Sequence, residues 1–143
     1  MSTKMKDGKK VVLTYGTFDM LHYGHIRILK RAKALGDYLI VGLSNDAFVR
    51  EKNKQCYFTY EFRKEMLEAI KYVDLVIEES DWNQKIPNVL QYQVDVFTIG
   101  DDWAGEFDYL KEYCEAVYLP RTVGISTSQM KDDFNLQELK KGE

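Results

Sequence analysis

Residues 10–25 read KVVLTYGTFDMLHYGH, and this stretch predicts a strand, a glycine-containing turn and the start of a helix in direct succession. The apolar run at 10–15 is typical of a buried strand. From about His22 to Ala34 the apolar residues recur at helical spacing, and a Gly-Asp pair ends that pattern. The chain therefore opens on a strand–turn–helix unit, from which parallel sheets are built.

The same alternation continues along the chain. Apolar runs predict further strands at 38–44, 74–79, 95–100 and 116–120. Helical patterns are present at 59–73, 82–93, 107–114 and 126–134. In the first of these helices, the predicted buried stripe consists of Phe62, Met66, Ala69, Ile70 and Val73. Such alternation predicts an α/β fold: a single Rossmann-like, doubly wound parallel sheet with helices on both faces.

Length and composition restrict the classes of protein that remain. The 143 residues suit one domain, which we expect over 10–135, between a flexible segment at 1–9 and a polar tail at 136–143. A net charge of −3 provides no strong positive field for nucleic acid. The charged start is unlike a signal peptide, and the longest apolar run, YLIVGL, is too short to span a membrane. We therefore expect a cytoplasmic protein without nucleic-acid or membrane partners.

Three unusual loops follow predicted strands and should meet at one edge of the sheet. They are GTFDMLHYGH from residue 16, GDDWAGE from residue 100 and RTVGIST from residue 121. Ligands of doubly wound sheets bind at the carboxyl ends of strands, near the point where the strand order reverses. These loops are therefore the candidate binding site.

The first loop contains the only two histidines of the chain, His22 and His25. Their i, i+3 spacing places them on one face of a first helical turn, where free backbone N–H groups and the helix dipole favour an anion. Gly24 between them allows close approach to the backbone. The pattern predicts a phosphate site; two surface histidines are the alternative, and a zinc site lacks a third nearby ligand.

Other charged residues could complete such a site. Arg121, Ser126 and Thr127 form a second candidate anion site at a helix start, unless the serine is only a cap. Lysines at 52, 54 and 85 follow the second and third strands, although most such lysines are simply solvated. Carboxylates at 19, 101 and 102 could hold Mg²⁺ on phosphates or accept from a ribose hydroxyl.

These motifs resemble a known family. TYGTFDMLHYGH, ending at His25, resembles the HxGH motif of the nucleotidyltransferase superfamily, and RTVGISTS resembles the RTxGIST signature of its cytidylyltransferase branch. GDYLIVGLSND, KYVDLVI and GDDW resemble the members of that branch that use glycerol 3-phosphate. The resemblance extends from about Val11 to Phe134. This chain departs from it at two positions: the family often has arginine in place of Lys71 and glutamate in place of Val123.

The resemblance implies transfer of CMP from CTP to sn-glycerol 3-phosphate, giving CDP-glycerol for teichoic acid and releasing pyrophosphate. It also implies a homodimer and Mg²⁺ bound with the CTP phosphates. The implied catalytic residues are His22, His25 and Arg121, and the implied acceptor ligands are Lys52 and Lys85. Residue chemistry and resemblance together predict these CTP contacts: Thr17, Phe18, Asp19, His22, Gly24, His25, Lys54, Asp102, Arg121, Thr122, Gly124, Ile125, Ser126, Thr127 and Ser128.

Three alternatives stay open at this point. The same chemistry on phosphocholine or phosphoethanolamine is the nearest. An adenylyltransferase shares the histidine motif but lacks RTxGIST. A non-catalytic nucleotide-binding domain is a different class, against which the intact histidine pair argues.

Overall fold

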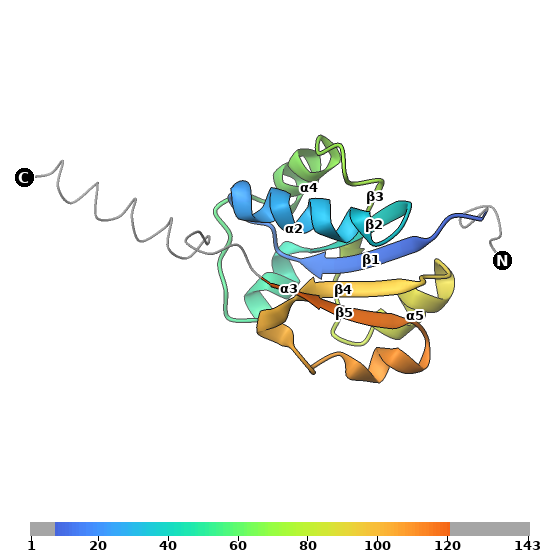
Figure 1. The fold of residues 1–143 in the computed structure, drawn as a ribbon. Helices are drawn as coiled ribbons and strands as arrows, with labels where there is room; N and C mark the ends of the chain where they lie inside the picture. The colour runs from blue at the N-terminus through green and yellow to red at the C-terminus, as the bar shows by residue number, and fades with distance from the viewer. Residues whose placement is uncertain (1–7, 121–143) are drawn as a thin grey trace, which may run out of the picture.

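A five-stranded, fully parallel sheet organises the computed structural model, which describes residues 8–120 (Figure 1). The strand order is β3-β2-β1-β4-β5, so the chain winds outward in both directions from β1. The strands are β1 (Val11–Gly16), β2 (Tyr38–Ser44), β3 (Leu75–Glu79), β4 (Val96–Gly100) and β5 (Glu115–Leu119). The predicted doubly wound parallel sheet is confirmed, and its order reverses between β1 and β4.

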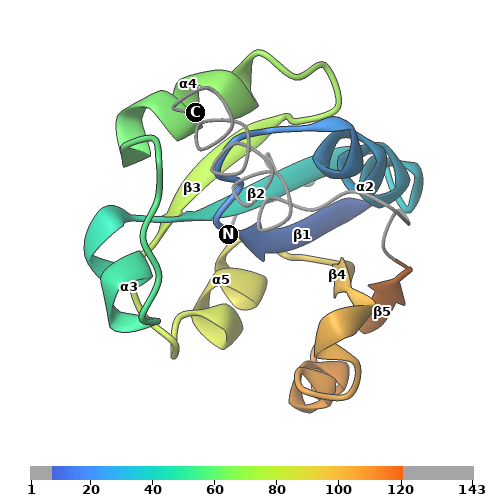
Figure 2. The ribbon, with the colours of Figure 1, turned by 90° about the vertical axis from the view of Figure 1, so that its left-hand side faces the viewer.

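Helices cover both faces of the sheet, as Figure 2 shows. One face carries α2 (Tyr23–Ala34) and α4 (Tyr60–Glu68), and the other carries α5 (Lys85–Gln91) and the 3₁₀ helix η2 (Asp108–Glu112). Two shorter elements, α3 (Asp46–Glu51) and the 3₁₀ helix η1 (Asp101–Trp103), follow β2 and β4 directly. Within residues 8–120, no helix is long and apolar enough to cross a membrane.

Alternate residues of β1 enter two separate cores. Val12 belongs to the core beneath α2 and α4, whereas Leu13 and Tyr15 belong to the core beneath α5 and η2. This alternation requires a strand that is apolar on both faces, and β1 is buried from Val11 to Tyr15. The buried strand places the loop that follows it at the centre of the sheet edge.

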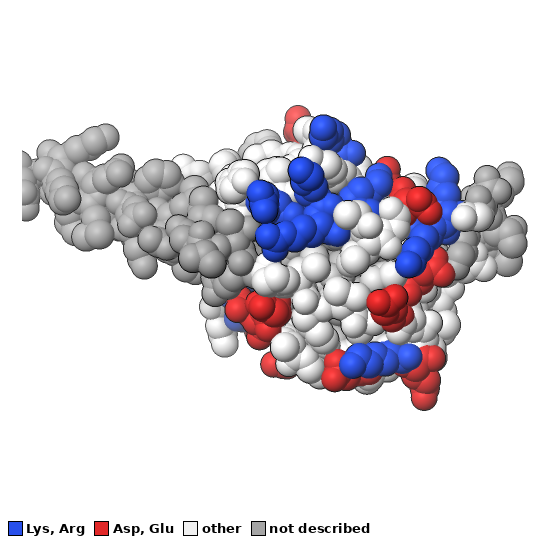
Figure 3. All heavy atoms as spheres, viewed as in Figure 1, with Lys and Arg blue, Asp and Glu red and all other residues white. Residues whose placement is uncertain are grey.

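Charges are separated on the face drawn in Figure 3. Lysine and arginine side chains gather over α2, and acidic side chains lie mainly lower on this face. The basic residues of α2 are Arg27, Lys30, Arg31 and Lys33, of which Lys33 pairs with Asp74 at 2.7 Å. This face therefore carries a basic region over α2 and acidic side chains beside and below it.

The helix predicted at 59–73 is shorter than expected and buries a different face. It ends at Glu68, and its buried residues are Arg63 and Leu67. Phe62, expected in the core, is 57% exposed, while Arg63 is fully buried. The prediction was wrong because helical periodicity considers only apolar residues. Arg63 can be buried because its guanidinium donates hydrogen bonds to several acceptors. Ile70 and Val73 still pack against the core, from beyond the helix end.

Other boundaries differ in smaller ways. The predicted helix at 82–93 is confined to Lys85–Gln91, with Pro87 in its first turn, where a missing N–H costs nothing. The expected helix at 107–114 is a 3₁₀ helix, and α3 was not expected. Asn45 caps α3 by accepting from the Phe48 N–H at 2.8 Å. The helix predicted at 126–134 and the polar tail lie outside the described residues.

Gly36 provides the first testable prediction, because it joins α2 to β2 where no side chain fits. An added Cβ would lie 2.6 Å from the Lys10 carbonyl oxygen and 2.7 Å from Val12 Cγ2. We expect Gly36→Ala to lower the free energy of unfolding by about 1–3 kcal/mol, measured by urea denaturation. Gly100→Ala is the control, because its nearest contact would be 3.7 Å away. Equal losses in both variants would contradict this reading of the turn.

Candidate active site

A cavity of about 440 Å³ opens at the carboxyl edge of the sheet. Its lining includes Tyr15 and Gly16 at the end of β1 and Ile99 at the end of β4. The cavity therefore lies where the strand order reverses, the expected ligand position in such folds. Of the predicted site residues, it brings together Thr17, Phe18, Asp19, His25, Lys52, Lys54 and Lys85.

The remaining predicted residues are placed differently. His22 and Gly24 lie at the start of α2 but outside the cavity lining, and Asp102 lies in η1. The whole RTVGISTS signature lies outside the described residues. Its predicted contacts stay predictions: Arg121, Thr122, Gly124, Ile125, Ser126, Thr127 and Ser128.

The two histidines form a reciprocal capping pair at the start of α2. His22 is the N-cap, and its Nδ1 accepts from the Gly24 N–H at 3.0 Å. His25 is the third residue of the helix, and its Nδ1 accepts from the His22 N–H at 3.2 Å. These are the N-cap and N3 positions of a capping box, which explains the spacing of the histidines.

This capping arrangement determines what the imidazoles can donate. Because each Nδ1 accepts a hydrogen bond, the proton of each neutral ring must lie on Nε2. The two rings stack with centroids 3.9 Å apart, so a double positive charge there would be unfavourable. Burial, together with the neighbouring His22, lowers the pKa of His25 to about 4, and Asp19 opposes the shift. Burial also lowers the pKa of His22. Near neutral pH both rings are therefore uncharged donors.

The lowered pKa predicts how stability depends on pH. The unfolded His25 binds a proton below its ordinary pKa of 6.5, whereas the folded side chain does so only near 4. The free energy of unfolding therefore falls as pH drops from 6.5 toward 4. We expect wild type to lose more stability than His25→Gln between pH 7 and pH 5, measured by urea denaturation at both pH values. Equal losses would show that His25 titrates normally.

The loop before α2 is held in an unusual backbone conformation. Phe18 and Met20 have positive φ angles of 48° and 51°, which is uncommon for residues other than glycine. The Phe18 ring is buried against Gly16, where an added Cβ would lie 2.6 Å from the ring. Such conformations persist only when surrounding contacts enforce them, and they concentrate at functional sites.

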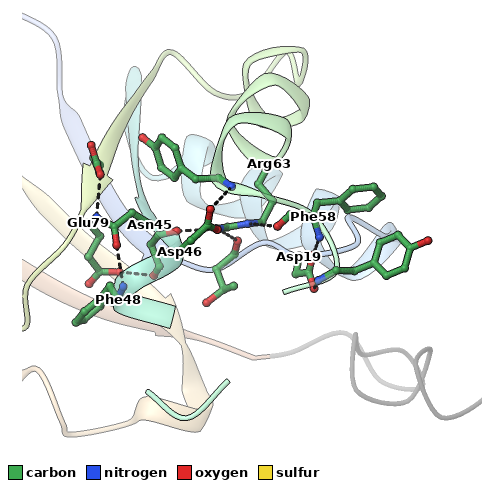
Figure 4. A network of polar contacts seen from close by, with 12 residues as sticks. Asp19, Asn45, Asp46, Phe48, Phe58, Arg63 and Glu79 are labelled. Atoms are coloured by element: carbon green, nitrogen blue, oxygen red, sulfur yellow. Dashed lines mark hydrogen bonds and ion pairs between the residues drawn. The ribbon is translucent and has the colours of Figure 1, made fainter. Parts of the chain in front are cut away.

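Asp19 fastens this loop to the segment before α4. Its two carboxylate oxygens accept from the backbone N–H groups of Tyr57, at 2.7 Å, and Phe58, at 3.1 Å (Figure 4). The side chain is buried. Its evident contribution is thus to shape the cavity wall, and the contact with CTP or Mg²⁺ expected from the sequence stays a prediction.

The two lysines predicted to hold the acceptor are linked through one carboxylate. Lys85 is only 3% exposed, and its Nζ lies 3.1 Å from Glu79 Oε2. The other oxygen of Glu79 accepts from the Ser44 hydroxyl at 2.8 Å, and Lys52 Nζ donates to Ser44 Oγ at 3.1 Å. Burial lowers the pKa of Lys52, and the Glu79 charge opposes that shift. Lys52 and Lys85 are therefore not merely solvated surface lysines. Lys54, by contrast, is exposed at the cavity.

Arg63 and Glu79 contribute to the site but were not predicted. The guanidinium of Arg63 donates to the carbonyl oxygens of Thr17, Ser44 and Phe58 and to Asp46 Oδ1, at 2.7–3.0 Å (Figure 4). It thereby joins the first loop, the end of β2, α3 and the segment before α4. Glu79 could have been found as a carboxylate at the carboxyl end of an apolar run; no sequence signal distinguishes Arg63 from a surface arginine.

The fold and site define a nucleotide-binding α/β protein, in which one neutral imidazole donor, His25, and three lysines line a cavity suited to phosphate-containing ligands. A family model described as cytidylyltransferase-like matches residues 13–138. Glycerol-3-phosphate cytidylyltransferase of Bacillus spizizenii is 59% identical over 125 residues, covering 87% of this chain and 97% of that protein. The Staphylococcus aureus enzyme of the same name is 58% identical, with 87% and 95% covered.

A solved structure agrees with this relationship. The lipopolysaccharide core biosynthesis protein from Thermoplasma volcanium superposes with a TM-score of 0.72 at 28% identity, covering 80% of this chain and 99% of that one. The chain belongs to the cytidylyltransferase-like family and, within it, to the glycerol-3-phosphate cytidylyltransferases.

Proposed function

We propose that this chain transfers CMP from CTP to sn-glycerol 3-phosphate, producing CDP-glycerol and pyrophosphate. The observation that carries the proposal is that donors from separate elements line one cavity. His25, at the start of α2, provides a neutral donor, and Lys52 and Lys85 provide cations from other elements. Two anions can therefore be held separately and brought together in one site.

The chemistry requires no general base from the protein. The second pKa of a phosphate monoester is about 6, so the acceptor is largely dianionic at neutral pH. One of its oxygens attacks the α-phosphorus of CTP, the bond from that phosphorus to the bridging oxygen breaks, and pyrophosphate leaves. Donors that strengthen their contacts as charge develops then supply the catalysis, without a covalent enzyme intermediate.

The two histidines and three lysines of the candidate site each have a role in this reaction. The Nε2–H groups of His22 and His25 donate to the triphosphate at the helix start, where the dipole of α2 adds to their effect. Lys52 and Lys85 bind the acceptor, and Lys54 binds CTP. Among residues 8–120, no group of three or more His, Cys, Asp or Glu side chains is placed to hold a metal. Mg²⁺ would therefore be held chiefly by the CTP phosphates, whose negative charge it would offset.

Three further expectations belong to the same proposal. The enzyme would work in the cytoplasm, as a homodimer, and its CDP-glycerol would supply teichoic acid synthesis. The names of the relatives support the product but not the location or the dimer.

Product analysis tests the proposed reaction. Incubation of the protein with CTP, Mg²⁺ and glycerol 3-phosphate should give CDP-glycerol and pyrophosphate in equal amounts by ³¹P NMR. Without the acceptor, CTP should stay intact. Formation of CMP and pyrophosphate without CDP-glycerol would indicate a hydrolase instead, and binding of CTP without turnover would support a non-catalytic domain.

Lys52 should affect the acceptor more than the nucleotide. Losing a charge-assisted hydrogen bond costs about 1.5–3 kcal/mol, so Lys52→Gln should raise the KM for glycerol 3-phosphate about 10- to 100-fold. The KM for CTP should change much less. Steady-state kinetics with both substrates varied will measure both constants, and Lys30→Gln, an exposed position on α2, is the control. If only the KM for CTP rises, Lys52 belongs to the nucleotide site.

A further inference from the structure

The ammonium group of Lys85 is enclosed by aromatic rings. Its Nζ lies 4.6 Å from the ring centroid of Tyr15, 5.1 Å from that of Phe107 and 5.9 Å from that of Trp82. Glu79 Oε2 lies 3.1 Å from the same nitrogen. The three rings and the carboxylate come from β1, β3, the turn before α5 and the segment before η2, and we call them the ammonium cage.

The walls of the ammonium cage are held by other contacts. The Tyr15 hydroxyl donates to Asn88 Oδ1 at 2.7 Å, and burial raises its pKa, so the ring stays neutral. Trp82 packs edge-on against Phe48, and Phe107 packs against Phe97. These contacts do not involve Lys85. The cage should therefore keep its shape when the lysine is shortened.

Three aromatic faces and a carboxylate form an arrangement that binds ammonium ligands. In this chain a side chain of the protein takes the place of such a ligand. All of the cage residues also line the cavity in which the acceptor is proposed to bind. A ligand in the cavity can therefore reach the position of the Lys85 ammonium.

We propose that Lys85 is a specificity-determining residue, whose ammonium fills the cage and excludes acceptors that carry their own cation. This inference rests on the proposed function. Phosphoethanolamine and phosphocholine bear a cation two carbons from the phosphate oxygen, and it would meet the like charge of Lys85. The glycerol head group is neutral, so its hydroxyls can accept from the ammonium without repulsion. Shortening Lys85 should leave Glu79 and the three rings free to bind the cation of the acceptor.

Substitution of Lys85 tests this exchange of acceptors. We expect Lys85→Ala to lose activity with glycerol 3-phosphate and to gain at least about 10-fold in kcat/KM with phosphoethanolamine over wild type, because desolvated cation–π contacts are strong. Lys85→Met should lose the first activity without gaining the second, since its side chain still fills the cage. Adding Glu79→Gln to Lys85→Ala should abolish the gain. Pyrophosphate release with CTP and each acceptor measures all of these values.

A binding measurement separates the cage from the reaction. Methylammonium chloride should raise the Tm of Lys85→Ala above the effect of equal sodium chloride, and it should not do so for wild type. It should also partly restore the activity of that variant with glycerol 3-phosphate. A variant that gains neither the new acceptor nor stabilisation by methylammonium, or that stays unfolded with methylammonium present, would overturn the inference. Wild type that makes no CDP-glycerol would instead refute the proposed function.

Discussion

His25→Ala is expected to lower kcat about 10²–10³-fold, the usual cost of removing one preorganised donor to a developing charge. The KM for CTP should change far less, because the contact strengthens only as charge moves onto the leaving pyrophosphate. His25 lines the cavity, and because its Nδ1 accepts from the His22 N–H at 3.2 Å, its Nε2–H is the group that can donate to a ligand. Steady-state kinetics with CTP and glycerol 3-phosphate will measure the effect.

The control for this variant must separate catalysis from helix capping. His25 occupies the N3 position of a capping box, where glutamine is a usual residue, so His25→Gln should keep the cap and the stability of α2. In the same way, His22→Asn places a strong N-cap at the start of the helix without an imidazole. Both variants should fold as wild type does and turn over slowly. Turnover near that of wild type in both would show that the histidines only cap the helix.

Arg63→Ala should have the largest effect on stability among the described residues. The guanidinium is fully buried and satisfies three backbone carbonyl groups and Asp46 at once. The Asp46 side chain is 37% exposed and can be hydrated, so the cost comes mainly from the three carbonyl groups that lose their donor. At about 1–3 kcal/mol for each unsatisfied buried group, the free energy of unfolding should fall by about 3–5 kcal/mol. Urea denaturation at pH 7 will measure the loss.

Lys64→Ala is the matched control for Arg63, from the next residue of the same helix. Lys64 makes an exposed pair with Glu68 at 3.7 Å, and such pairs contribute about 0–1 kcal/mol. Arg63→Lys should remain destabilised, because one ammonium group cannot take the place of a planar guanidinium with four separate acceptors. A loss below about 1 kcal/mol in Arg63→Ala would show that the buried network is not what joins the loop to the sheet.

The strands could be predicted from the sequence because burial on both faces leaves a continuous apolar run. The strand predicted at 38–44 has these bounds in the structure. Both ends of the other four strands lie within one residue of the predicted ends. The helices were harder. The pattern at 59–73 predicted Phe62 in the core and gave no sign that Arg63 is buried. Periodicity depends on how apolar a residue is, and not on how many hydrogen-bond acceptors surround it. The six-residue helix α3 is too short to produce a period.

Several residues that line the cavity could be predicted from the sequence, but the hydrogen bonds that connect them could not. The histidine pair and the lysines could be recognised because each follows a strand at the carboxyl edge. That one carboxylate, Glu79, links Lys52 to Lys85 could not be foreseen, because the contacts depend on how β2, β3 and α5 meet in space. The reciprocal capping by His22 and His25 could not be foreseen either, because it depends on which residue is the N-cap of α2.

The most direct test of the central claim is a comparison of acceptors and nucleotides by pyrophosphate release. CTP or ATP would each be combined with glycerol 3-phosphate, phosphoethanolamine and phosphocholine, with Mg²⁺ present throughout, and kcat/KM would be determined for each pair. We expect the kcat/KM for CTP with glycerol 3-phosphate to exceed that of every other pair by a wide margin. A higher kcat/KM with phosphoethanolamine or phosphocholine, or with ATP as the nucleotide, would contradict it.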